Sequence, residues 1–235
     1  MGLKRVLFSL FLSALLAACG SYGDDKAPDF RYRLTVEVDT PEGLRTGRSV
    51  IEVKQSIGGS AGSGYSPKIF RRARGDAVAV DLPGGKTLYA LHVSKLSLQW
   101  TANIFSEFAL RRPDQEWGEQ FYNVLEVEGV QTLPRRFPKR GALPERSAYP
   151  LLVTFEDENE PTSIGLIDPD DMAPSFGQGV KLRRITVELT DAPVTTGIRE
   201  RLKWLGMSLK GREKREFPEG LPVGDFDSLF VRDGE

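Results

Sequence analysis

Two stretches near the start of the chain alternate apolar and polar residues with a period of two. Residues 30–39, FRYRLTVEVD, place tyrosine, leucine and valine on one face, and residues 49–55 alternate in the same way. This period is typical of strands with one buried face, and the TPEG turn at residues 40–43 predicts an antiparallel hairpin. Residues 75–82 and 86–93, split by Pro-Gly-Gly, predict a second hairpin. Together the four strands predict one antiparallel sheet with one covered face.

The middle of the chain changes to a helical spacing. Large apolar residues recur there in steps of four, in two runs: Trp100, Ile104 and Phe108, then Trp117, Phe121 and Leu125. Such steps place side chains on one stripe of a helix, so we expect helical segments that cover one face of the sheet. Residues 131–150 contain four prolines and predict a loop. Strand patterning returns at residues 150–157 and 181–190.

A short helix is expected between these last two strands. Asp168 has the residue type of a helix cap, Pro169 suits the first turn, and Asp170 and Asp171 suit the positive end of the helix dipole. Gly177 would end this helix.

The whole pattern predicts an α+β fold, mainly antiparallel sheet with a helical middle segment covering one face. We expect a single globular domain over residues 29–235, with strands from both sides of the middle segment in one sheet. Residues 198–205 add an amphipathic turn or two, and a charged tail follows Lys210.

The first 18 residues have the pattern of an export signal. Lys4 and Arg5 precede an apolar run over residues 6–18 that ends in small residues. The run is shorter than the roughly 20 helical residues that cross a bilayer. It therefore predicts a removable signal and not a permanent membrane span.

The end of that run, Leu16-Ala17-Ala18-Cys19-Gly20, resembles the lipobox of bacterial lipoproteins. In that class the cysteine thiol receives diacylglycerol, cleavage makes the cysteine the new N-terminus, and its amine is usually acylated too. The resemblance implies lipidation of Cys19, with residues 19–28 as a flexible tether. Because Gly20 and not Asp follows the cysteine, it implies the outer membrane of the cell envelope, facing the periplasm. The alternative is an ordinary secretory signal with a chance cysteine.

Residues 166–198 and 31–43 resemble segments of uncharacterised proteobacterial proteins. This resemblance implies a recurring domain and brings no activity, cofactor or catalytic residue.

The composition limits how the mature protein can be stabilised and what it can bind. Cys19 is the only cysteine, so no disulfide is available. Without Lys4 and Arg5, 30 of the 32 basic residues remain against 33 acidic ones, a formal charge of about −3. Such a balance argues against a nucleic-acid partner, which would require a strongly basic face.

One motif suggests nucleophilic catalysis. Residues 58–62, GGSAG, fit G-x-S-x-G with Ser60 as nucleophile. No helical stripe follows the serine, and His92, the only histidine, would leave Asp76 or Asp81 as the acid in a very short span. A loop between strands explains this Gly/Ser/Ala run more simply. We expect His92 to be half-buried or at the surface.

Acidic residues gather at 156–160 and again at Asp168, Asp170 and Asp171. A calcium site needs six to eight oxygen ligands, and EDENE lacks the EF-hand order. We favour solvated acids over a calcium site and expect no metal or cofactor, although an acidic pair suited to glycoside hydrolysis stays open.

Basic residues form three clusters that suit an anionic membrane surface, each cation adding up to about 1 kcal/mol. They are Arg71, Arg72 and Arg74; Arg135, Arg136, Lys139 and Arg140; and Lys210, Arg212, Lys214 and Arg215. Solvated loops are the alternative. The sequence as a whole favours a membrane-anchored, non-catalytic lipoprotein whose domain binds an envelope partner. The second hypothesis is an envelope hydrolase that uses Ser60 or an acidic pair.

Overall fold

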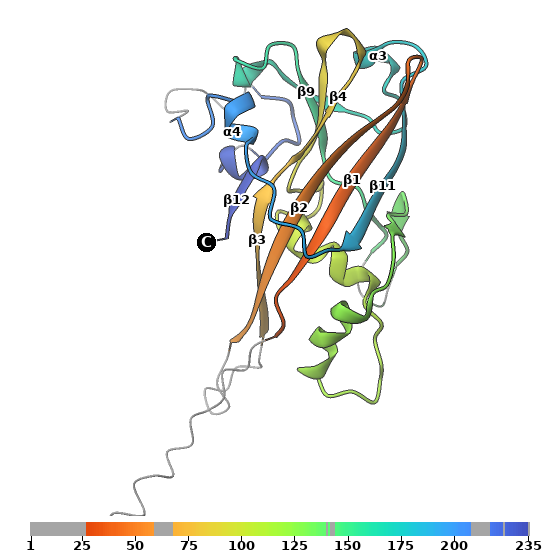
Figure 1. Ribbon diagram of the computed structural model, residues 1–235, viewed down its shortest axis with the longest axis vertical. Coiled ribbons are helices and arrows are strands. Elements are labelled where there is room, and N and C mark those ends of the chain that lie inside the picture. The colour runs from red at the N-terminus through yellow and green to blue at the C-terminus, as the bar shows by residue number, and fades with distance from the viewer. Residues whose placement is uncertain are drawn as a thin grey trace, which may run out of the picture.

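The computed structural model describes residues 27–58, 68–139, 141, 144–207, 217–222 and 224–234. Within these ranges most regular structure is antiparallel strand and the helices are short (Figure 1). The sheet-dominated fold expected from the alternating stretches is therefore confirmed. None of the helices in the described ranges combines the length and the apolar character that crossing a membrane requires.

A six-stranded antiparallel sheet forms the larger layer. In spatial order its strands are β12 (Val231–Asp233), β3 (Lys68–Asp76), β2 (Gly43–Gly58), β1 (Phe30–Thr40), β11 (Lys181–Leu189) and β6 (Gln131–Thr132). The first predicted hairpin is present, because β1 and β2 pair from their turn along the whole of β1. β11 pairs with β1 from the far end of the chain, which confirms that strands on both sides of the middle segment share a sheet.

The second predicted hairpin belongs to a separate sheet, so the expectation of one sheet for the first four strands is wrong. This sheet has the order β10 (Ile164–Ile167), β9 (Leu152–Phe155), β5 (Thr87–Ala90) and β4 (Val78–Asp81). The 3-10 turn η1 (Pro83–Gly85) joins β4 to β5. Within the predicted loop, β7 (Arg136–Phe137) and β8 (Arg146–Ser147) form a small ribbon.

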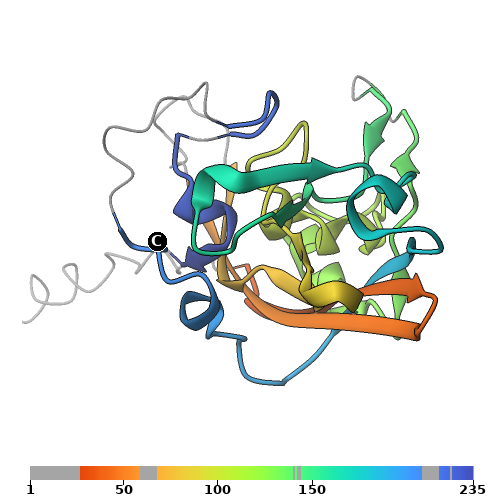
Figure 2. The ribbon, with the colours of Figure 1, turned by 90° about the horizontal axis from the view of Figure 1, so that it is seen from above.

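The main hydrophobic core lies on one face of the six-stranded sheet, here called the inner face. It contains residues of β1 and β2, of the four-stranded sheet and of the segment 100–127. Tyr32 is fully buried there, its ring stacks on Phe105 at a centroid distance of 5.4 Å, and its hydroxyl donates to the Thr101 carbonyl at 2.7 Å. Figure 2 shows the six-stranded sheet and the β9–β10 strands on opposite sides of the molecule.

A second core joins the four-stranded sheet to the C-terminal part of the chain. Phe230 is fully buried at its centre, and the centroid of its ring lies 5.5 Å from that of Trp204 and 5.9 Å from that of Tyr89. β12 begins at the next residue, so this packing fixes where β12 meets β3.

Gly75 marks the point at which the chain leaves the six-stranded sheet for β4. Its φ is +140°, a conformation that L side chains rarely adopt, and a Cβ there would lie 2.9 Å from the Val50 carbonyl oxygen. The segment that follows β11 crosses the outer face of the sheet (Figure 1), and its Thr195 hydrogen-bonds to both of the diverging strands, β2 and β3. The N–H of Thr195 donates to Val50 at 3.0 Å, and its carbonyl accepts from Asp76 at 3.2 Å.

The helices are single turns or 3-10 segments. They are α2 (Trp100–Asn103), η2 (Phe105–Phe108), η3 (Glu119–Glu126), η4 (Pro161–Ser163), α3 (Ala173–Phe176), α4 (Ile198–Arg201) and η6 (Asp227–Leu229). The predicted stripe of Trp117, Phe121 and Leu125 is wrong, because a 3-10 helix has three residues per turn. Val124 and Val127 are buried instead, while Trp117 and Leu125 are 42% and 47% exposed.

The predicted helix start at Asp168 is also wrong. The Asp168 side chain accepts from the Asp170 N–H at 2.9 Å, and its carbonyl accepts from Asp171 at 3.2 Å, which makes a tight turn. α3 starts later, after Met172, and ends at Gly177 with φ +93°, as expected for its C-terminal residue.

Candidate functional site

His92 is fully buried, so the expectation of a half-buried or surface side chain is wrong. Its Nε2 lies 3.0 Å from the Gly75 carbonyl, and its Nδ1 lies 3.0 Å from the Thr101 hydroxyl. Because a carbonyl only accepts, the geometry assigns the proton to Nε2. Burial, together with the nearby charge of Arg232, lowers the pKa of His92 to about 3. The ring is thus a neutral structural group that joins β3 to the segment after β5.

Neither carboxylate considered for a catalytic triad bonds to His92. Asp76 is buried and accepts from the N–H of Ile198 at 2.8 Å, and burial raises the pKa of its carboxyl. Asp81 pairs with Arg201 at 2.5 Å. Ser60 and Cys19 lie outside the described residues.

Side chains from both acidic clusters form hydrogen bonds or ion pairs with other residues of the domain. Asp170 accepts from Arg135 at 2.9 and 3.1 Å, which lowers the pKa of Asp170, while Asp168 closes its own turn. Glu158 accepts from the Tyr89 hydroxyl at 2.6 Å. Among the described residues no group of three or more His, Cys, Asp or Glu side chains is placed to hold a metal ion.

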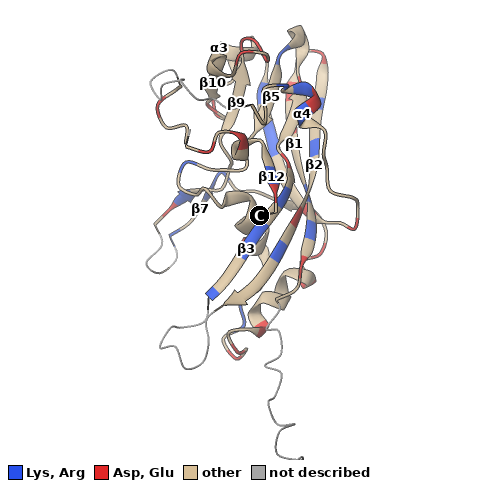
Figure 3. Ribbon diagram, turned by 90° about the vertical axis from the view of Figure 1, so that its left-hand side faces the viewer, with Lys and Arg blue, Asp and Glu red and all other residues tan. Residues whose placement is uncertain are grey.

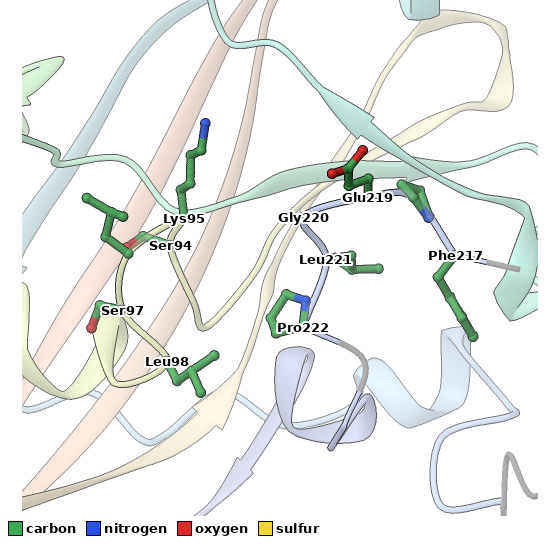
Figure 4. Close-up of a pocket in the computed structure, with 11 residues that line it drawn as sticks. Ser94, Lys95, Ser97, Leu98, Phe217, Glu219, Gly220, Leu221 and Pro222 are labelled. Carbon is green, nitrogen blue, oxygen red and sulfur yellow. The ribbon is translucent and has the colours of Figure 1, made fainter. Parts of the chain in front are cut away.

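One cavity, of about 920 Å³, lies between the turn at residues 94–98 and the segment 217–222 (Figure 4). Leu96 and Leu98 stand at this turn with 66% and 60% of their surface exposed. Lys95 and Glu219 are the ionisable residues of its lining. The cavity therefore offers an apolar surface and not a set of proton-transfer groups.

A second cavity, of about 880 Å³, follows the border of the six-stranded sheet at β3. Residues 69–73 form one wall, and residues 231–234, at and beyond β12, continue it. His92 and Thr101 lie at its base. Arg71 on the inner face and Arg72 on the outer face both contact it, so the cavity wraps the edge of the strand.

The hydrogen bonding of Gln55 in β2 shows which way the backbone of β3 points. The Gln55 N–H donates to Asp29 at 2.9 Å, on the side of β1. The N–H and C=O of a strand residue point to the same side, so Gln55 has no ladder bonds with Arg71, its partner in β3. The backbone groups of Arg71 therefore point away from β2, and by alternation so do those of Ile69 and Ala73.

These outward-pointing groups have no neighbouring strand in the part of the chain that the structure describes. β12 pairs with β3 only between Arg74 and Asp76. In Figure 1, β12 lies beside the upper part of β3, and the lower part borders the sheet. We call residues 68–73 the open edge.

Two arginines face this cavity from the inner side without a carboxylate partner in the described residues. Arg71 donates to the side-chain oxygens of Gln55 at 2.7 Å and Asn103 at 3.0 Å, and Arg232 donates to the Leu98 carbonyl at 2.8 Å. Burial lowers the pKa of both guanidinium groups. Each is a cation that is partly removed from water and hydrogen-bonded to neutral oxygens, with a carboxylate nearby but not in contact: Glu107 near Arg71 and Asp225 near Arg232.

On the outer face, basic side chains line the same edge. Lys68 and Arg72 are exposed, as is Lys54 beside them on β2, and none of the three forms an ion pair with any described residue. Figure 3 shows this side of the molecule, with basic residues along β3. Phe70 lies between Lys68 and Arg72 and is 54% exposed.

In the basic cluster that begins at Arg135, two arginines form ion pairs. Arg135 binds Asp170, and Arg136 binds Glu145 at 3.2 Å. In the predicted cluster at residues 71–74, Arg72 forms no ion pair with a described residue, while Arg74 lies 3.9 Å from Glu52; the strand that carries this cluster was not predicted. The cluster that begins at Lys210 lies outside the described residues.

No family model matches the chain, and neither a curated protein nor a solved structure matches it.

Proposed function

We propose that this protein is a lipoprotein of the bacterial cell envelope, held in the membrane by acyl chains on Cys19, whose domain is a non-catalytic binding module. The observation that carries the proposal is the Leu-Ala-Ala-Cys sequence at the end of the N-terminal apolar run. The outer membrane, with the domain in the periplasm, is the proposed location. The proposal requires no cofactor and no nucleic acid.

The anchor would hold the domain at a surface although none of its described helices could cross a membrane. One buried acyl chain gives only marginal binding, since each methylene contributes about 0.8 kcal/mol, but two or three chains on one residue give lasting attachment. Ala27 is buried and the Pro28 carbonyl accepts from Gln55 at 2.7 Å, so the proposed tether shortens to residues 19–26, which reach at most about 29 Å when fully extended. The domain therefore remains close to the bilayer.

The start of β1 supports an orientation of the domain on this tether. Phe30, the first residue of β1, pairs with Val53. Beyond that pair, β2 continues to Gly58, and β3 begins opposite it at Lys68. The open edge of β3 therefore lies at the end of the domain that the tether enters.

The role proposed for the middle segment is to cover the inner face of the sheet. Its support is the packing of Trp100, Phe105 and Val124 into the main core, where Phe105 stacks on Tyr32. In this role the segment stabilises the sheet and supplies one wall of the cavity at β3.

Palmitate labelling of cells that produce the protein tests the proposal. We expect Cys19→Ala to abolish labelling and to release the protein from the membrane fraction, and the matched variant Ser21→Ala to change neither. A Cys19→Ala protein that is still labelled and retained would contradict the lipid anchor.

A further inference from the structure

We infer that the open edge of β3 binds an extended, acidic segment of a partner protein, which adds to the six-stranded sheet as a further strand. The inference rests on the proposed role as a binding module and gives the chemistry of its partner. Three observations carry it: backbone groups without a ladder partner among the described residues, a cavity along them, and cations that form no ion pair with those residues.

The backbone supplies the affinity. Ile69, Arg71 and Ala73 direct their N–H and C=O groups outward, and an extended peptide forms ladder bonds with such groups whatever its sequence. β12 already forms this kind of pairing with the next residues of β3, from Arg74 to Asp76. A bound strand would continue the position of β12 along the same border.

The side chains supply the specificity. In an added strand, alternate residues face the two sides of the sheet. On the outer side they would meet Lys68 and Arg72, which favours glutamate or aspartate, because opposite charges on neighbouring strands attract. On the inner side they would meet Arg71 and the wall at Ala102 and Leu98, which suits small or short polar residues.

The cavity also contains three acidic residues, and one of them, Asp233, lies opposite Arg74, next to the open edge. Asp233 pairs with Arg199 at 3.4 Å, Asp227 accepts from the Gly206 N–H at 2.6 Å, and Asp225 lies near Arg232. These contacts offset the acidic charges, whereas Lys68 and Arg72 form no ion pair with any described residue.

A second copy of this chain is disfavoured as the occupant. Pairing two open edges would bring Lys68 and Arg72 of one copy close to the same cations of the other, and like charges on neighbouring strands repel. Exposed basic residues also protect sheet edges from such self-pairing. Lys68 and Arg72 would instead attract an acidic partner strand.

Fluorescence anisotropy with a short fluorescein-labelled peptide of alternating threonine and glutamate tests the inference, using the full lipidated chain in detergent micelles. We expect saturable binding that weakens about tenfold or more when the peptide backbone is N-methylated at alternate residues, since the ladder bonds are then lost. A peptide with lysine in place of glutamate should not bind.

Charge reversal locates the site. We expect Arg72→Glu and Lys68→Glu each to weaken binding about tenfold. The matched control is Arg48→Glu, which reverses an exposed arginine on the same face of β2, where β3 is no longer the neighbour. The control should bind the peptide as the unchanged protein does.

Absence of peptide binding would overturn the inference, and so would binding that is insensitive to N-methylation or equally weakened by Arg48→Glu. A dimer in sedimentation experiments that Arg72→Glu dissociates would also overturn it, because the occupant would then be a second copy. These outcomes leave palmitate labelling of Cys19 unchanged, so the inference and the lipid anchor fail independently.

Discussion

The two halves of the outer face of the six-stranded sheet use the same residue types in opposite ways. Across β1 and β11 the charges are paired: Arg33 with Glu188 at 2.5 Å, Arg184 with Glu37 at 2.8 Å, and Arg183 with Asp39 at 2.8 Å. Along β3, Lys68 and Arg72 have no such partner among the described residues. The difference lies in the neighbouring strand: β1 and β11 place acidic residues beside their arginines, whereas the β2 residues opposite Arg72 and Lys68 are Lys54 and Gly58.

Glu52 marks the boundary between the two halves. It accepts from Arg31 at 3.0 Å, while Arg74 of β3 lies 3.9 Å away. One carboxylate thus serves both sides, and beyond it the outward-facing charged residues of β2 and β3 are the basic Lys54, Arg72 and Lys68. The predictions below test whether the paired half supports the fold and the β3 half supports binding.

The largest effect on stability is expected at Phe230, which packs next to β12 at the end of β3 that β12 covers. Phe230→Ala removes a fully buried ring next to β12 and should destabilise the protein by about 3–5 kcal/mol in urea denaturation. Met207→Ala, at a residue 63% exposed, is the control and should change stability by less than about 0.5 kcal/mol. A small effect of Phe230→Ala would show that β12 is held by other contacts.

Low pH is expected to destabilise the protein through His92, which contacts Gly75 at the end of β3. Burial holds the pKa of His92 at about 3 in the folded protein, well below its ordinary value, so the unfolded chain binds the proton more tightly. Stability from this group is fully present above the unfolded pKa of about 6.5 and falls as the pH drops towards 3, with about 2 kcal/mol lost between pH 7 and pH 5.

Urea denaturation at these two pH values checks this loss, and His92→Gln is the comparison. As the chain has one histidine, the variant should be less stable at neutral pH but should show a much flatter dependence between pH 5 and 7. An equally steep dependence in His92→Gln would assign the effect to other groups.

A smaller effect is expected in the paired half. Glu188→Gln removes the partner of Arg33, and both side chains are about one-third exposed. A cross-strand ion pair of this kind contributes about 0.2–1 kcal/mol. Thermal unfolding at low and high salt measures it, and the difference from the unchanged protein should shrink as salt rises.

The smallest effect on stability is expected at the open edge. Arg72→Gln removes a charge without a described partner, so the free energy of unfolding should change by less than about 0.5 kcal/mol. Peptide binding should nevertheless weaken. If Arg72→Gln destabilises the fold more than Glu188→Gln does, the contrast between the two halves is wrong.

The strands with regular alternation were predictable and the edge strand was not. β1 alternates apolar and polar residues throughout, so the residues on its inner face could be predicted from the sequence. β3 places Arg71 on the inner face, where Gln55 and Asn103 accept its hydrogen bonds, and this breaks the pattern. The alternation of Ile69 and Ala73 with charged residues is the only local signal of the strand.

The candidate site depends on information that is not local. Whether β3 lies at a border follows from the strand order, and β12, which covers part of it, is only three residues long and comes from the other end of the chain. In the middle segment, η3 adopts the tighter 3-10 period, so a spacing of four misplaced its buried face. His92 ends a recognisable strand pattern, but its burial depends on Gly75 and Thr101, which meet only in the fold.

Hydrogen–deuterium exchange of individual amides, followed by NMR with and without the alternating threonine–glutamate peptide, tests the open edge most directly. The account predicts slower exchange at Ile69, Arg71 and Ala73 when the peptide is bound, and no change at Val36, which is already inside the sheet. Peptide binding that leaves the exchange of all three β3 amides unchanged would contradict it.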